Sequence, residues 1–105
     1  MPGTIQWNAT YTGGGPHPSA EIYDAEEQVV QSKYVPCKPP INCAFSMNDL
    51  PFGEYTAALV SGSDHYYFVG GEGIISAPNQ SSEAQTLVLT EDNPTASVTI
   101  NVQPE

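Results

Sequence analysis

The chain has 105 residues, a length that fits one domain built around one modest hydrophobic core. The chain contains twelve acidic residues and only two basic ones, both lysines, so the formal net charge is −10 at pH 7. This charge excludes nucleic-acid binding and attachment to an anionic membrane surface, because both require a cationic face. No apolar run approaches the ~20 residues that span a bilayer, so membrane insertion is not expected.

Alternation of apolar and polar residues with a period of two runs through the chain and predicts strands rather than helices. In the first predicted strand, residues 4–11, the odd-numbered positions are apolar or aromatic and the even-numbered ones are polar. Four further strands are predicted at residues 20–23, 28–34, 43–47 and 54–61. Between them stand a glycine run followed by proline, the acidic turn 24–27, the proline-rich loop 35–42 and the turn 48–53.

The second half of the chain continues this pattern. A sixth strand is predicted at residues 65–69, a short one at 74–75 inside a glycine- and serine-rich stretch, and the last two at 84–90 and 95–102. Seven or eight short strands with turn signals between them predict an all-β fold, an antiparallel β-sandwich with Greek-key connections. Nothing in the sequence divides the chain, so residues 1–105 are predicted to form a single domain.

Residues 45–57, with the sequence FSMNDLPFGEYTA, carry the most specific pattern. They resemble the F-x-x-x-x-L-P-x-G-x-Y segment of transthyretin-like, or prealbumin-like, sandwiches, which include the carboxypeptidase regulatory-like domains and the CnaB-type domains of bacterial surface proteins. The resemblance implies a sandwich of transthyretin or immunoglobulin type. In physical terms, Leu50 is expected to close the end of the core, Pro51 to fix the backbone entering the turn, and Gly53 to adopt an angle that other residues resist. A folding pattern of this kind says little about function.

CnaB-type domains often carry an intramolecular isopeptide bond between a lysine and an asparagine. Asn101 is suitably placed on the last predicted strand. The first predicted strand contains no lysine, and Lys33 and Lys38 lie in a different part of the chain. We therefore predict no isopeptide bond.

The two cysteines, Cys37 and Cys43, enclose a short loop with two prolines and are predicted to form a disulfide, the alternative being free thiols in a reduced protein. Their spacing does not match that of metal-binding cysteines. A disulfide, together with a surface rich in Ser, Thr, Asn and Gln, predicts an extracellular or cell-surface location. Asn8 and Asn79 begin sequons for N-glycosylation.

No residue pattern predicts catalysis. The two histidines, His17 and His65, stand in no nucleophile or metal motif and are interpreted as a solvated loop residue and a strand-end residue. The acidic turns are interpreted as solvated, with a calcium-binding loop as the alternative. The sequence therefore predicts that the protein is not an enzyme and has no catalytic residues, no cofactor and no metal.

Aromatic residues are the first candidates for a binding site. Trp7 and Tyr11 share the apolar side of the first predicted strand and are expected in the core, Trp7 being also a less favoured binding candidate. Tyr66 and Tyr67 are consecutive in a strand, so they point to opposite faces, and at least one aromatic ring there is expected to be exposed. An exposed tyrosine on a sheet face can stack on a sugar ring, which makes Tyr66 and Tyr67 candidate carbohydrate-binding residues.

Lys38 is the second candidate. It stands in the loop from Cys37 to Cys43, which loosely resembles the disulfide-closed, proline-containing reactive loops of Bowman–Birk-type trypsin inhibitors. The ring is two residues shorter here, and Pro39 takes the place of serine. The resemblance implies a protease inhibitor that presents Lys38 on a rigid loop.

The function favoured by the sequence is a non-catalytic extracellular module, either a structural spacer or an adhesion or protein-interaction domain. A carbohydrate-binding module and a protease inhibitor are the two alternatives. The expected partner is a protein or a polysaccharide, and self-association through edge strands is the other interaction considered.

Overall fold

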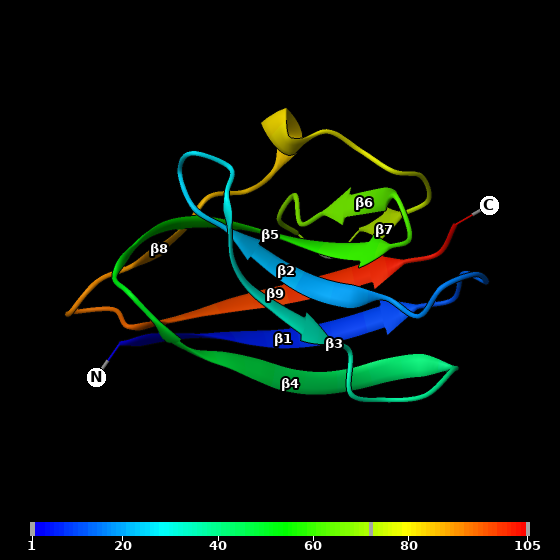
Figure 1. Cartoon of the computed structure of the whole chain (residues 1–105), viewed down its shortest axis with the longest axis horizontal. Helices are drawn as coiled ribbons and strands as arrows, with labels where there is room; N and C mark the ends of the chain where they lie inside the picture. The colour runs from blue at the N-terminus through cyan, green and yellow to red at the C-terminus, as the bar shows by residue number, and fades with distance from the viewer. Residues whose placement is uncertain (1, 72, 105) are drawn as a thin grey trace.

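The computed structural model describes residues 2–71 and 73–104, and within them the chain forms nine strands and one short 3₁₀ helix (Figure 1). The strands are β1 (Gly3–Tyr11), β2 (Ser19–Tyr23), β3 (Val29–Tyr34), β4 (Ile41–Leu50), β5 (Gly53–Ser61), β6 (Asp64–Tyr67), β7 (Ile74–Ile75), β8 (Leu87–Leu89) and β9 (Thr95–Val102). The 3₁₀ helix, η1, spans Ser81–Glu83.

The strands form two sheets that pack face to face (Figure 1). One sheet has the order β4-β1-β9-β7, and the other has the order β3-β2-β5-β6, with β8 paired to the start of β5. The predicted all-β sandwich is thus confirmed. The pairing is not antiparallel throughout, because β9 runs parallel to both of its neighbours, β1 and β7.

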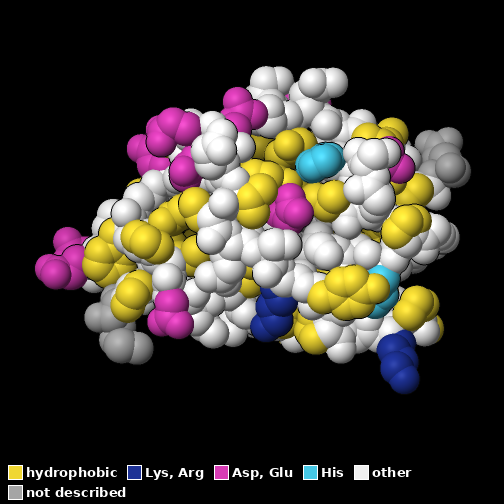
Figure 2. Space-filling model, in the orientation of Figure 1, with side chains coloured by type: hydrophobic (Ala, Val, Ile, Leu, Met, Phe, Trp, Pro, Cys, Tyr) yellow, Lys and Arg dark blue, Asp and Glu magenta, His cyan; other side chains and the backbone are white. Residues whose placement is uncertain are grey.

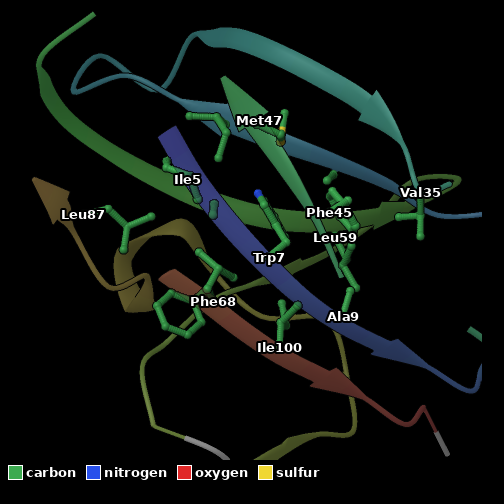
Figure 3. Close-up of a cluster of buried hydrophobic side chains, with 14 of the residues drawn as sticks. Ile5, Trp7, Ala9, Val35, Phe45, Met47, Leu59, Phe68, Leu87 and Ile100 are labelled. Atoms are coloured by element: carbon green, nitrogen blue, oxygen red, sulfur yellow. The ribbon is translucent and has the colours of Figure 1, made fainter. Parts of the chain in front are cut away.

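The core lies between the sheets, and β1 shows how the sequence pattern builds it. Its odd-numbered side chains are buried, and its even-numbered ones lie on the outer face. Trp7 stands opposite Phe45 of β4, and the two rings stack with centroids 5.5 Å apart. Figure 3 shows Trp7 in the middle of the buried cluster, with Leu59 approaching from the other sheet. Trp7 and Tyr11 are therefore core residues, as predicted.

The crossover from β4 to β5 carries the chain from one sheet to the other, and it contains the predicted motif. Leu50 is buried at the end of the core, and Gly53 adopts φ +157°. The Tyr55 hydroxyl donates a hydrogen bond to the carbonyl of Pro51, which ties the start of β5 to the turn. Because Asp49 adopts φ +63° at an irregularity in the β1–β4 pairing, β4 continues to Leu50 and does not end at residue 47 as predicted.

Three other predicted boundaries differ from the structure by two residues or more. β4 begins at Ile41, inside the predicted loop 35–42, because Ile41 pairs with Tyr11 at the end of β1. β6 ends at Tyr67, before the glycine turn at residues 70–71, where both glycines have positive φ. β8 is shorter than the predicted strand 84–90, because the preceding residues form η1 and Ala84 is its C-cap.

The predicted disulfide between Cys37 and Cys43 is present. It joins the loop that follows β3 to the third residue of β4, with the two Cα atoms 6.4 Å apart. The proline-rich loop between these strands is thereby held against the edge of the sandwich. Among the described residues, no helix is long and apolar enough to cross a membrane.

Candidate functional site

The outer face of the second sheet carries a row of rings from two strands. His65 and Tyr67 of β6 lie with ring centroids 5.9 Å apart and ring planes 18° apart. Tyr67 and Tyr23 of β2 lie with centroids 5.7 Å apart and planes 41° apart. We call His65, Tyr67 and Tyr23 the aromatic row. The row is a candidate platform for a planar or apolar ligand surface.

Strand register explains why these rings meet. β2 and β6 flank β5, and Ala58 of β5 stands opposite both Glu21 and Tyr67. By alternation Ala58 points to the outer face, yet it is fully buried, so larger neighbouring side chains cover it. The small side chain on the central strand thus leaves room for rings from both sides to approach each other.

Hydrogen bonds fix both tyrosines of the row. The Tyr23 hydroxyl donates to Oε1 of Glu21 at 2.6 Å. In the middle of the row, the Asn79 side chain accepts from the Tyr67 backbone N–H at 2.7 Å and donates to the Tyr67 carbonyl at 3.2 Å. Asn79 therefore takes the place of a further strand beside β6. Its amide nitrogen, the atom that would carry a glycan at the second sequon, is already hydrogen-bonded to Tyr67.

The electrostatics of the row keep its hydroxyls protonated. Burial raises the pKa of Tyr23 far above its usual range, and the hydrogen bond to Glu21 acts in the same direction. Burial also raises the pKa of Tyr67, and the negative charges of Glu27 and Glu21 raise it further to a smaller extent. A hydrogen bond with Tyr23 acts in the opposite direction and lowers this pKa. Both tyrosines are thus neutral hydroxyls beside carboxylates at physiological pH. This arrangement provides donors and acceptors next to an aromatic surface.

A cleft of about 300 Å³ adjoins the row, between the β2–β3 turn and η1, which rise on the same side of the sheet in Figure 1. Thr56, which stands opposite Tyr23 in the β2–β5 pairing, lines it. The other polar side chains of its wall are carboxylates and hydroxyls: Asp24, Glu27, Glu54, Tyr55, Ser81, Ser82 and Thr86. Figure 2 shows hydrophobic side chains, one acidic group and one histidine gathered near the middle of this face, and further acidic groups to their upper left.

The four predicted binding residues do not come together. Trp7 is fully buried and Tyr66 is 3% exposed, so the prediction that either ring serves as a stacking platform is wrong. Tyr66 stands opposite Leu59, a core position of β5, and β6 therefore turns it inward and Tyr67 outward. Tyr67 is partly exposed in the aromatic row. Lys38 is exposed in the disulfide loop, on a different part of the molecule.

Tyr66 and Tyr11 reach a second cleft, of about 660 Å³, at the end of the sandwich. The glycine run of the β1–β2 loop, Asp64 and Pro78 form much of its wall. Because both tyrosines are almost fully buried, little of either ring is open to this cleft. The second cleft is thus a poorer stacking site than the aromatic row.

Sequence reasoning missed three residues of the site: Tyr23, Glu21 and His65. A signal for two of the pairings was present, because Glu21 and Tyr23 are two apart, as are His65 and Tyr67, and such residues share a face of a strand. No local signal indicated that β2 and β6 flank the same strand. His17, interpreted as a solvated residue, instead stacks on Tyr34 with centroids 4.3 Å apart and bonds the Val35 carbonyl at 2.8 Å.

Within residues 2–71 and 73–104, no three His, Cys, Asp or Glu side chains gather closely enough to hold a metal ion. Comparisons of the chain with protein-family models, with curated proteins and with solved structures found no match. The geometry of the aromatic row is therefore the basis on which we assign a function.

Proposed function

We propose that this chain is a non-catalytic recognition module of an extracellular or cell-surface protein, and that the aromatic row binds a saccharide. One observation carries the proposal. Two partly exposed rings, His65 and Tyr67, lie nearly parallel on a sheet face beside a tyrosine–carboxylate pair, Tyr23 and Glu21.

Sugars suit such a surface for two chemical reasons. The C–H faces of a pyranose ring carry partial positive charge and pack on the negative face of an aromatic ring. The hydroxyl groups at the ring's rim need hydrogen-bond partners, which the Glu21 carboxylate and the tyrosine hydroxyls supply. The serine and threonine hydroxyls of the adjoining cleft extend the polar surface beyond the row.

The charges around the row favour a neutral saccharide over an anionic one. Glu21 and Glu27 both act on the Tyr67 hydroxyl, and a uronate or sulfate there would meet like charge. The two lysines lie elsewhere, Lys33 against β4 and Lys38 in the disulfide loop. We expect the same module to serve as an adhesive or spacer domain where its saccharide is part of a surface.

The compartment and the type of sandwich are parts of the same proposal. The disulfide supports an extracellular location, because such bonds persist in oxidising environments. The Leu50, Pro51, Gly53 and Tyr55 motif at the sheet crossover supports a transthyretin-like type.

Affinity electrophoresis tests the binding function directly. Native gels are cast with neutral or with anionic soluble polysaccharides, and the mobility of the protein is compared with that in a plain gel. We expect retardation by at least one neutral polymer and roughly tenfold weaker retardation of Tyr67→Ala, which corresponds to about 1.4 kcal/mol. Phe52→Ala is the matched control, because Phe52 is an exposed aromatic residue on the sheet crossover, away from the row. Unchanged mobility throughout, or equal retardation of Tyr67→Ala, would reject saccharide binding by the row.

The disulfide loop supports a second candidate function, protease inhibition. The loop is closed by Cys37 and Cys43, and Lys38 is exposed on it, next to Pro39 and Pro40. A closed loop loses little entropy when it enters a protease pocket. Inhibition of a trypsin-like protease that disappears in Lys38→Ala would support this candidate, and absence of inhibition by the wild type would remove it.

A further inference from the structure

Strand β3 forms one edge of the second sheet and has an open side. The Val35 N–H donates to the carbonyl of Pro18 at 3.2 Å, and antiparallel pairs alternate between hydrogen-bonded and non-hydrogen-bonded positions. The backbone groups of Lys33 and Gln31 therefore face β2, while those of Ser32 and Tyr34 point away from it. Val30 is the extra residue of a bulge near the start of the strand.

The other long edges of the described sandwich are partly occupied. Asn79 binds both backbone groups of Tyr67 on the outer side of β6. On β4, Lys33 Nζ donates to the Ser46 carbonyl at 3.1 Å, and the Gln31 amide donates to the Asn48 carbonyl at 2.9 Å. Edge groups engaged in this way do not recruit another strand. β3 is therefore the edge best suited to pair with another chain.

The surface along β3 is charged in opposite ways at its two ends. The turn before it carries Asp24, Glu26 and Glu27, whereas the strand itself contains no acid and ends near Lys33 and Lys38. Figure 2 shows both lysines at the lower edge and a group of acids at the upper left, which match the end and the start of β3 in Figure 1. Two such edges complement each other only when they run antiparallel.

We propose that two copies of this chain pair antiparallel through β3, about a twofold axis at Ser32. In this register, Val30 of one copy lies opposite Tyr34 of the other, and these exposed side chains, 42% and 66% exposed, bury apolar surface on pairing. Lys33 lies opposite Gln31, so no like charges meet on the strand. The turn that carries Glu26 in one copy then lies at the same end of the pair as the loop that carries Lys38 in the other, and both side chains are exposed in the single chain.

The pairing has a consequence that rests on the proposed function. A twofold axis perpendicular to the sheet keeps the outer faces of both copies on the same side. The two aromatic rows would then face the same surface, and a polymer or a decorated surface would be bound at two points, with the gain in avidity that linked sites give.

Sedimentation equilibrium over a wide range of protein concentration, without saccharide, tests the pairing independently of the proposed function. We expect a reversible monomer–dimer equilibrium in the wild type. Ser32→Pro removes an N–H that points away from β2 and leaves the β2–β3 ladder intact, as proline on a strand edge does. We expect it to weaken dimerisation at least tenfold. Circular dichroism and the emission of Trp7 show whether this variant is folded.

Charge exchange gives a second test that does not depend on proline. Lys38→Glu and Glu26→Lys should each weaken the dimer about two- to fivefold, as expected of an exposed ion pair, and the double variant should recover most of the loss. Ile74→Ser, at an exposed apolar residue of β7, is the control and should dimerise as the wild type does. A wild type that stays monomeric to roughly millimolar concentration, or folded Ser32→Pro and charge variants that dimerise unchanged, would overturn the proposal.

Discussion

Tyr67 combines features that seldom occur together in one side chain. Its ring is partly exposed, both of its backbone polar groups are hydrogen-bonded by the Asn79 side chain, and its hydroxyl lies in the field of two carboxylates. A ring held in this way loses little conformational entropy when a ligand packs on it. Its contribution to binding therefore follows from the residues around it as much as from the ring itself.

Because burial raises the pKa values of four tyrosines, we predict that the protein loses stability at alkaline pH. Burial raises the pKa values of Tyr23, Tyr55, Tyr66 and Tyr67 in the folded protein, whereas in the unfolded chain they ionise near the usual value of about 10. Above that pH the unfolded chain binds fewer protons than the folded one. The free energy of unfolding should thus be constant with respect to these groups below about pH 9 and fall above pH 10.

Urea unfolding at a series of alkaline pH values measures this slope. Each tyrosine contributes up to about 1.4 kcal/mol per pH unit, so Tyr23→Phe should flatten the decline by up to that amount. Tyrosinate absorbance of the folded protein should appear later in the titration than that of the unfolded chain. A slope that Tyr23→Phe leaves unchanged would show that Tyr23 titrates alike in both states.

Trp7 brings an unsatisfied polar group into the core. Its indole N–H is buried and has no hydrogen-bond partner within the described residues. Trp7→Phe removes this donor along with part of the ring. An unsatisfied buried donor costs about 1–3 kcal/mol, which offsets much of the lost packing. We expect Trp7→Phe to change the free energy of unfolding by less than about 1.5 kcal/mol, and Trp7→Ala to lower it by about 3–5 kcal/mol.

Chemical denaturation of both variants provides the measurement. The loss in Trp7→Phe is the decisive quantity, because this substitution removes the donor and keeps most of the aromatic packing, whereas Trp7→Ala removes both. A loss in Trp7→Phe well above about 1.5 kcal/mol would mean that the indole N–H is satisfied in solution, for example by a water molecule, so that its removal gives no gain.

At the scale of elements, a disulfide stabilises the connection between β3 and β4. The disulfide between Cys37 and Cys43 closes a short loop beside the edge of the sandwich. Removing it as a Cys37→Ala/Cys43→Ala pair should lower the free energy of unfolding by about 2 kcal/mol, because the unfolded chain regains the entropy of the open loop. Urea unfolding of the oxidised wild type and of the double variant checks this value, and a difference near zero would mean that the loop is already ordered in the unfolded chain.

Element by element, the sequence predicted most where a strand is long and alternates. Residues 95–102 match β9 in full, and residues 4–11 fall one short of β1. The crossover motif predicted the places of Leu50, Gly53 and Tyr55 because its residues act locally. β8 was predicted too long, since the apolar pattern did not reveal that Glu83 turns back to bond the N–H of Gln80.

At the scale of the whole molecule, the pairing of distant strands decides where the site lies. The parallel pairing of β1 with β9 joins the two ends of the described chain, and no turn signal indicates it. Likewise, Tyr23 and Tyr67 meet only because β2 and β6 flank β5. Alternation predicted that Tyr66 and Tyr67 face opposite ways, but which of them faces the core depends on that same long-range register.

Nuclear magnetic resonance of the labelled protein, titrated with an oligosaccharide from a polymer that retards it in affinity gels, tests the central claim most directly. We predict that the shift changes concentrate on His65, Tyr67 and Tyr23 and extend to Thr56 at the adjoining cleft, with little change at Trp7 in the core. Shift changes that concentrate instead on the loop from Cys37 to Cys43, or on the glycine-walled cleft at the end of the sandwich, would contradict the assignment of the binding site to the aromatic row.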